Sequence, residues 1–472
     1  MQKRSILIFL VGLMFLQGCS IYHGDSTQPA LGPQVEEVHT LPTQGQGPTL
    51  SERDQFEETI SPLELEDEAT GQMNPEIVIA TDIHYLAKEL TDFGPAFEEM
   101  VQSGDGKAIT YVWEITDAFL EEVIARKPQA LILSGDLTLE GEQLSHEKKK
   151  NKLKRVEDSG ISVFVIPGNH DINNPWAAAY KGKEAIPAAR TSPEKFVSIY
   201  GDFGYDEALS RDPASLSYLA ELDDGTWLLM LDSCQYKTES LVGGMIQQET
   251  YSWIEKVLDD AWYEKRQVIP VAHHNLLDES RVYEENCTIE HSEELGKMLG
   301  GWDIRLFLSG HLHVQHYRSS EEWQVSEIVT GSLSMSPCTY GVLKYFGPEE
   351  FYYHTERVDV SAWASKKGNP DINLQNFESY ADEFLQSIFY KQAEANLEKY
   401  SLSANEKQRM AEVYALLNVY AVEGRAWQIR DEMMKTPAYE IWQKYDRTDI
   451  LCMYMNDIIE DAVCDYNVFS RH

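Results

Sequence analysis

The sequence predicts an α/β fold in which a sheet-containing domain is followed by an appended all-helical C-terminal domain. Short apolar runs of strand length recur through the middle of the chain, and segments with helical spacing separate them. After Pro370 the spacing is helical almost throughout. The 472 residues are 43% hydrophobic and 11% aromatic, which is enough apolar material to bury the cores of two or three domains.

The first 19 residues have the features of an export signal. Two basic residues precede an apolar run over 6–16 that is short for a membrane span. Residues 16–19 resemble a bacterial lipobox, which implies that Cys19 is diacylated. We therefore expect an exported lipoprotein of the bacterial cell envelope, held by its lipid anchor on the outer side of the cytoplasmic membrane. An ordinary secretion signal or an uncleaved anchor is the alternative, and each would also export the protein.

Three further segments follow. Residues 20–74 are rich in Gln, Pro, Thr, Gly, Ser and Glu, and we interpret them as a flexible acidic tether. Residues 75–365 form the expected catalytic domain, and residues 370–472 form the expected helical C-terminal domain.

The elements follow from local periodicity. Strands are expected at 76–80, 130–133, 161–166, 226–231, 267–271 and 304–308, with helices at 114–126, 141–156 and 249–262. From 323 to 358, strand-like segments follow one another without helices, and we expect them to form a second sheet packed on the first. C-terminal helices are expected at 376–400, 405–421, 426–435 and 437–457.

Polar motifs follow five of the apolar runs. They are Asp82-Ile83-His84, Gly135-Asp136, Gly168-Asn169-His170-Asp171, His273-His274 and Gly310-His311-Leu312-His313. Any one of them alone is common in turns and caps. In α/β folds, however, ligands gather outside the carboxyl ends of the strands, where these motifs lie. Together the five motifs predict a site for two metal ions.

The residue types suit the hydrolysis of phosphoesters. Two divalent metals can neutralise a phosphate and supply hydroxide near neutral pH. Asp136 is the candidate bridging carboxylate, because the small Gly135 allows the backbone to approach closely. Asp82 and His84 point the same way, two residues apart, and can share one metal. Mixed Asp, His and Asn ligation suits Mn, Fe, Zn or Co better than Ca or Mg.

These motifs resemble those of the calcineurin-like metallophosphoesterase family over roughly residues 75–358. The resemblance implies a two-sheet α-β-β-α sandwich and two divalent metal ions, with Mn and Fe favoured. It also implies a metal-bridging hydroxide that attacks in line, with His170 as general acid or phosphate contact and Asp171 orienting it. The implied ligands are Asp82, His84, Asp136 and His313 for metal 1, and Asp136, Asn169, His273 and His311 for metal 2.

The export signal, the motif at 82–85 and the helical extension resemble, more narrowly, the bacterial class III cyclic-nucleotide phosphodiesterases. One departure is Asn275, where the family often has Pro soon after the histidine pair. We expect His273 to bind metal and His274 to lie behind it or face substrate. His146 is a second candidate for substrate contact, although a helix-start role is the alternative. His316 is expected to face solvent.

The charge balance restricts the partners. With 78 Asp and Glu against 40 Lys and Arg, the net charge is −38, which argues against a stable nucleic-acid complex and against polybasic docking on lipid. A small phosphoester substrate, such as a cyclic nucleotide, remains compatible. The alternatives are a phosphomonoesterase or nucleotidase on the same metals, or a surface binding lipoprotein on a decayed catalytic fold, which would have lost ligands. The oligomeric state is open.

Five cysteines remain after Cys19, and an odd number cannot all pair within the chain. They are Cys234, Cys287, Cys338, Cys452 and Cys464. A bridge between Cys452 and Cys464 is the pairing that the sequence leaves open.

Overall fold

The computed structural model describes residues 76–282, 285–445 and 447–472. The expected export signal, the lipidation site Cys19 and the tether at 20–74 lie outside the described residues. Within the described ranges, no helix is both long and apolar enough to cross a membrane.

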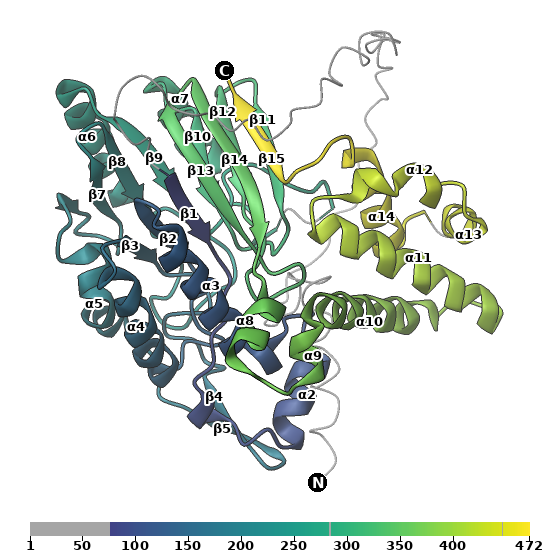
Figure 1. Ribbon diagram of the computed structural model, residues 1–472. Coiled ribbons are helices and arrows are strands. Elements are labelled where there is room, and N and C mark those ends of the chain that lie inside the picture. The colour runs from purple at the N-terminus through teal and green to yellow at the C-terminus, as the bar shows by residue number, and fades with distance from the viewer. Residues whose placement is uncertain (1–75, 283–284, 446) are drawn as a thin grey trace, which may run out of the picture. The chain divides into compact units, whose positions relative to one another are not determined.

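Two β-sheets form the centre of the fold (Figure 1). The first sheet has the strand order β15 (Val468–Arg471), β14 (Glu350–Arg357), β13 (Thr339–Gly347), β1 (Glu76–Ala80), β2 (Ala130–Ser134) and β3 (Ser162–Ile166). The second has the order β11 (His316–Ser320), β12 (Val325–Val329), β10 (Leu306–Ser309), β9 (Gln267–Val271), β8 (Thr226–Met230), β7 (Tyr218–Asp223) and β6 (Ser210–Arg211). A separate hairpin pairs β4 (Ala178–Lys181) with β5 (Glu184–Pro187).

The two sheets pack face to face, and both faces of the central strands are buried. On β8, Leu228 and Met230 join the core shared with the first sheet, whereas Trp227 and Leu229 join a second core with helix α6. This alternation follows the two-residue period of a strand. Because the strands are apolar on both faces, helices must cover the outer face of each sheet. The expected α-β-β-α sandwich is thereby confirmed.

Helices surround the sheets and form the C-terminal region. The helices before residue 310 are α2 (Pro95–Ser103), α3 (Val112–Arg126), α4 (Gln143–Glu157), α5 (Pro193–Tyr200), α6 (Gln248–Glu264) and α7 (Ser292–Gly301). The later helices are α8 (Val360–Lys367), α9 (Ile372–Gln375), α10 (Phe377–Leu397), α11 (Ala404–Val422), α12 (Arg430–Met433), α13 (Pro437–Tyr445) and α14 (Ile450–Asp461). Short helical turns lie at Lys88–Leu90, Ile109–Tyr111, Gly201–Tyr205 and Ala426–Gln428.

The expectation that the strands within 323–358 form the second sheet was wrong for two of them. β13 and β14 extend the first sheet, where β13 pairs antiparallel with β1. β12 does belong to the second sheet, together with β8, β9 and β10. Local periodicity reveals that a segment is a strand, but pairing is decided by distant residues, so the sequence could not assign these strands to a sheet.

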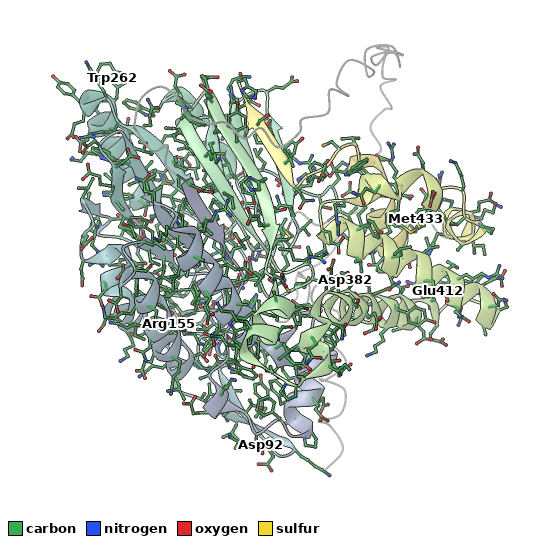
Figure 2. The ribbon with its side chains drawn as sticks, in the orientation of Figure 1. Asp92, Arg155, Trp262, Asp382, Glu412 and Met433 are labelled. Atoms are coloured by element: carbon green, nitrogen blue, oxygen red, sulfur yellow. The ribbon has the colours of Figure 1, made fainter. Side chains whose placement is uncertain are left out.

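The helical C-terminal region has its own core and also contacts the sheet region. Residues of α10, α11, α13 and α14 enclose the buried Trp442 and Tyr414. On α10, Asp382 (Figure 2) accepts a hydrogen bond from Ser336 Oγ in the loop before β13. The chain then returns as β15 to the edge of the first sheet, a strand that the sequence analysis did not anticipate. Cys464 carries a free thiol, so the bridge to Cys452 is not formed.

Candidate metal centre

All the candidate metal ligands follow the carboxyl ends of parallel strands. β1, β2 and β3 are parallel in the first sheet, and β9 and β10 are parallel in the second. Five of the seven candidate ligands adopt a positive φ: Asp82, His84, Asp136, His311 and His313. Left-handed backbone at non-glycine residues is costly and is found disproportionately at functional sites. The strand ends therefore turn sharply so that these side chains converge.

The first group consists of Asp82, His84, Asp136 and His313, whose ligand atoms all lie within 4.8 Å of one another. His84 Nε2 lies 3.0 Å from His313 Nε2 and 3.8 Å from Asp136 Oδ2. His313 Nε2 lies 3.2 Å from Asp82 Oδ1. This group coincides with the ligands that the resemblance implied for metal 1.

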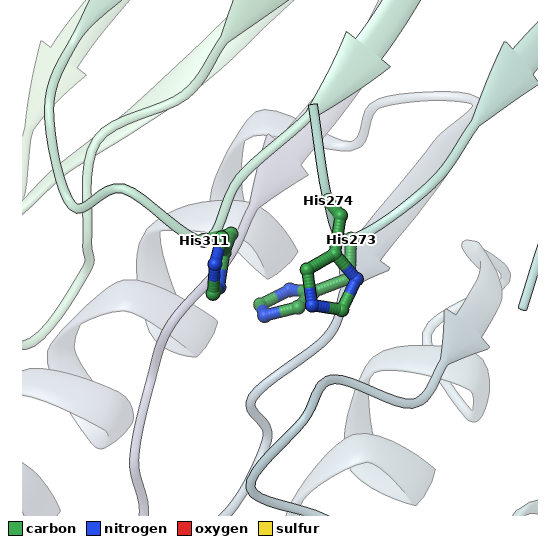
Figure 3. A group of neighbouring side chains, drawn as sticks. All are labelled: His273, His274 and His311. Carbon is green, nitrogen blue, oxygen red and sulfur yellow. The ribbon is translucent and has the colours of Figure 1, made fainter. Parts of the chain in front are cut away.

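The second group contains His273, His274 and His311, whose rings lie side by side in Figure 3. His273 Nδ1 donates to Ser134 O at 2.9 Å, so in the neutral ring Nε2 carries the lone pair. That nitrogen lies 3.1 Å from Asn169 Oδ1 and 3.5 Å from Asp136 Oδ2. Asn169 and Asp136 thus complete the set implied for metal 2.

Hydrogen bonds also orient the rings of His311 and His274. His311 Nε2 donates to Asn286 O at 2.9 Å and leaves Nδ1 as the ligand atom. His274 Nε2 donates to Val242 O at 2.9 Å, and its Nδ1 accepts from Ser233 Oγ at 2.8 Å. Both ring nitrogens of His274 are therefore occupied. We infer that His273 is the ligand of the pair and that His274 supports the ring of His311, whose centroid is 4.4 Å away.

The donor set fits two divalent cations. Burial raises the pKa of the Asp82 and Asp136 carboxyls, but the neighbouring histidines more than offset it and hold both values below their usual range. Both side chains are therefore anionic at neutral pH, as metal ligands must be. Asp136 Oδ2 lies within 4 Å of both His84 Nε2 and His273 Nε2, between the two groups. It is thus placed to bridge two cations.

His170 lies beside this centre, with 19% of its side chain exposed. Its Nδ1 donates to Leu139 O at 2.8 Å and lies 3.1 Å from Glu140 Oε2, while Nε2 lies 3.9 Å from Asp136 Oδ2. Burial lowers the pKa of His170, but the carboxylates of Asp136 and Glu140 outweigh this effect and raise it to about 10. At neutral pH His170 therefore holds a proton on Nε2.

Asp171 does not orient the His170 ring, contrary to our expectation. Its carboxylate accepts hydrogen bonds from the backbone N–H groups of Gly168, Leu137 and Thr138 at 2.9–3.0 Å, and from the Thr138 hydroxyl. Asp171 therefore holds the two ligand-bearing loops together. The His170 ring is oriented by Leu139 O and Glu140 instead, since these are the groups within reach of its Nδ1.

Of two other histidines, one takes the alternative role that the sequence offered and one was misplaced. His146 lies in the first turn of α4, as the helix-start alternative held, and it is completely buried and hydrogen-bonded to Tyr200 OH and Asp171 O, so it does not face substrate. His316 does not face solvent but lies 2.6 Å from Asp461 Oδ2 and also contacts the Glu279 carboxylate. Periodicity could not show either contact, since the partners come from distant segments.

The sequence reasoning also missed three charged residues at the centre. Glu140 could have been suggested by its position four residues after Asp136 on the same loop. Asp105 and Lys107 precede α3 and carried no motif. Asp105 Oδ2 lies 3.6 Å from His313 Nδ1 and 2.9 Å from Lys107 Nζ.

Comparison with known proteins gives two family matches. Residues 75–315 match the model of the calcineurin-like phosphoesterases. Residues 359–465 match the model described as the C-terminal domain of cyclic nucleotide phosphodiesterase. No curated protein matches the chain.

Several solved structures are similar in fold. A dimetal phosphatase from Danio rerio is 11% identical, with a TM-score of 0.42 over 61% of this chain and 97% of that one. A purple acid phosphatase from seeds of yellow lupin (Lupinus luteus) is 13% identical, with a TM-score of 0.39 over 61% and 52%. A protein from Staphylococcus aureus that is described as a 5'-nucleotidase is 14% identical, with a TM-score of 0.34 over 57% of this chain and 50% of that one.

Proposed function

The chain belongs to the calcineurin-like phosphoesterases, and from this premise we propose that it hydrolyses a cyclic nucleotide or a similar small phosphodiester with two divalent metal ions. The observation that carries the dimetal chemistry is the convergence of two buried donor groups that share Asp136. The match of residues 359–465 to the C-terminal domain of cyclic nucleotide phosphodiesterase supports the diester substrate.

The residues of the centre would have two different roles, metal binding and proton donation. When bound, two divalent cations neutralise phosphate charge and lower the pKa of water. Asp82, His84, Asp136 and His313 would hold one cation, and Asp136, Asn169, His273 and His311 the other. His170 Nε2 would donate a proton to the leaving oxygen, a role supported by the hydrogen bond of its Nδ1 to Leu139 O and by its raised pKa.

The acidic chain favours a small substrate over a polymer. A net charge of −38 repels long polyanions, whereas a single phosphate can be bound by local charges in the centre. The expected export signal and lipid anchor support the further proposal that hydrolysis takes place outside the cytoplasmic membrane.

The test is turnover of the purified protein after metal depletion and reloading with Mn²⁺. Bis-p-nitrophenyl phosphate, p-nitrophenyl phosphate, and the 3′,5′- and 2′,3′-cyclic nucleotides would be compared. We expect metal-dependent cleavage, diesters preferred over the monoester, and one cyclic nucleotide preferred among them. Preference for the monoester would move the assignment to a phosphatase or nucleotidase, and no turnover with any metal would contradict hydrolysis.

A further inference from the structure

Asn174 ties the carboxylate of Glu140 to the loop that carries His170. Its amide nitrogen Nδ2 donates to Glu140 Oε2 at 2.7 Å and to His170 O at 3.1 Å. The same carboxylate oxygen lies 3.1 Å from Nδ1 of the His170 ring. Asn174 is buried, with only 4% of its surface exposed. A buried amide thus holds the oxygen that contacts the ring of the expected proton donor.

The hydrogen bonds of Asn174 allow only one orientation of its amide. Oδ1 accepts from the backbone N–H of Trp176 at 2.9 Å, while Nδ2 faces the two oxygens. Turning the amide over would place Oδ1 against the Glu140 carboxylate and against His170 O, where acceptors would meet without a proton between them. It would also place the NH₂ group against the N–H of Trp176. The donor side of Asn174 therefore faces Glu140.

Glu140 needs an anchor because its side chain has freedom to move. The side chain is 23% exposed, and a glutamate loses much rotamer freedom when it is held in one geometry. Its backbone, by contrast, is fixed beside the donor loop, since a Cβ on the next residue, Gly141, would stand 2.8 Å from His170 O and 2.9 Å from Asp171 O. The loop therefore brings Glu140 next to His170, and the Asn174 amide selects the rotamer that reaches the ring.

We propose that Asn174 is a positioning residue for the hydrolytic reaction, which acts by fixing the Glu140 carboxylate against His170. This inference rests on the proposed function. Leu139 O lies 2.8 Å from His170 Nδ1, so the ring N–H is shared between a backbone oxygen and the carboxylate oxygen. The loop sets the place of the first, and Asn174 sets the place of the second. Together they hold the ring so that Nε2 is directed toward the leaving oxygen.

The kinetic test compares wild type, Asn174→Ala and Asn174→Asp in the full-length, Mn²⁺-loaded protein. We expect kcat for a cyclic nucleotide to fall by about 10- to 100-fold, as is typical when a partner that orients a side chain of a metal site is removed. The loss with bis-p-nitrophenyl phosphate should be smaller, because nitrophenolate needs little protonation. KM and the metal content, measured by elemental analysis, should stay at the wild-type level. Gln143→Ala is the control, because it removes another amide–carboxylate hydrogen bond of 2.7 Å, to Glu147 on α4.

The Asp variant separates positioning from a structural role. An ionised Asp keeps an acceptor for Trp176 N but cannot donate to Glu140. Wild-type kcat in Asn174→Asp would overturn the proposal, since only the turn at Trp176 would then depend on this residue. Equal losses of kcat for the two substrates would also overturn it.

A double-mutant cycle tests whether Asn174 acts through Glu140. In a Glu140→Ala background the carboxylate is gone, so Asn174→Ala should cause almost no further loss of kcat. Losses that multiply in the double variant would show that the two residues act independently and would contradict the proposal.

A measurement without turnover separates this proposal from the proposed function. In the Zn²⁺-loaded protein, which is diamagnetic, the proton on His170 Nδ1 should give a low-field NMR signal that is identified by its loss in His170→Ala. Asn174→Ala should shift this signal and speed its exchange with water, whereas Gln143→Ala should not. An unchanged signal would overturn the proposal. A wild-type protein that cleaves no ester would contradict the proposed function, and the NMR signal would still decide whether Asn174 holds the ring.

Discussion

Gly135 lies directly against the imidazole ring of His273. A Cβ built on Gly135 would stand 2.4 Å from His273 Nδ1 and 2.9 Å from Gly168 Cα, and the residue has a φ of +102°. Both the contact and the dihedral angle exclude a side chain. This close approach allows Ser134 O to accept the hydrogen bond from His273 Nδ1 that leaves Nε2 toward Asp136.

Gly135→Ala should therefore displace His273 and weaken metal binding. We expect loss of metal and of turnover, with a free energy of unfolding lower by about 1–3 kcal/mol from backbone strain. Elemental analysis and chemical denaturation measure the two effects. Gly301→Ala is the control, because nothing lies within 4 Å of a Cβ at that position in α7. Full metal content in the Gly135 variant would contradict this account.

The shared carboxylate can be tested by Asp136→Asn. Removing the negative charge between the two donor groups should abolish turnover while the domain stays folded, and Asn169→Ala should do the same by removing one ligand of the second group. Circular dichroism checks the fold, and cleavage of bis-p-nitrophenyl phosphate checks activity. Wild-type rates in either variant would rule out the dimetal mechanism.

The proton donor can be tested through the leaving group. His170→Ala should retain metal but lose about 10²- to 10⁴-fold in rate with a poor leaving group. The loss should be smaller with nitrophenolate, which needs little protonation. Cleavage rates of a cyclic nucleotide and of bis-p-nitrophenyl phosphate supply the comparison. Equal losses for both substrates would reject the role of general acid.

A fourth prediction concerns pH and the contact of His316 with Glu279 and Asp461. Burial lowers the pKa of His316, but these carboxylates outweigh it and raise the value from 6.5 to about 9. Because the folded-state value is the higher one, the stabilisation is complete below pH 6.5 and is lost as the pH rises through 9. Over that window the free energy of unfolding should fall by at most about 1.4 kcal/mol per pH unit for this proton.

Chemical denaturation at several pH values measures this slope. In His316→Gln the slope should be smaller by the contribution of one proton, since the other titrating groups are common to both proteins. Identical slopes in the two proteins would show that the histidine is not held in its charged form.

Metal removal should lower the thermal stability. The buried carboxylates and histidines of the centre bind cations in the folded state, so free Mn²⁺ at about 100 times its Kd should add about 2.7 kcal/mol to the free energy of unfolding. A thermal melt after chelation, and again after Mn²⁺ is restored, measures the difference. Asp136→Asn should show a much smaller response to Mn²⁺, and an equal response would place the stabilising ion elsewhere.

Much of this centre could be predicted from residue order. A buried strand is visible as an apolar run, and a ligand two residues beyond its end has a nearly fixed place, so Asp82, His84 and Asp136 could be identified locally. The same reasoning gave the α/β class and the helical extension, whereas the α-β-β-α sandwich was implied by the family resemblance. It failed for Asp171 and His316, because the partners of these side chains include residues from other segments of the chain.

The sequence by itself indicated the candidate metal ligands, since five motifs lie at the carboxyl ends of strands. Only the tertiary structure decided which hydrogen bonds the rings of His273 and His274 make, which sheet receives β13 and β14, and that the ion pair of Lys107 and Asp105 lies next to His313. The physical reason is the distance along the sequence between the residues that interact. Strand and helix periodicity is set by neighbouring residues, whereas ring orientation, strand pairing and local charge depend on groups that only the folded chain brings together.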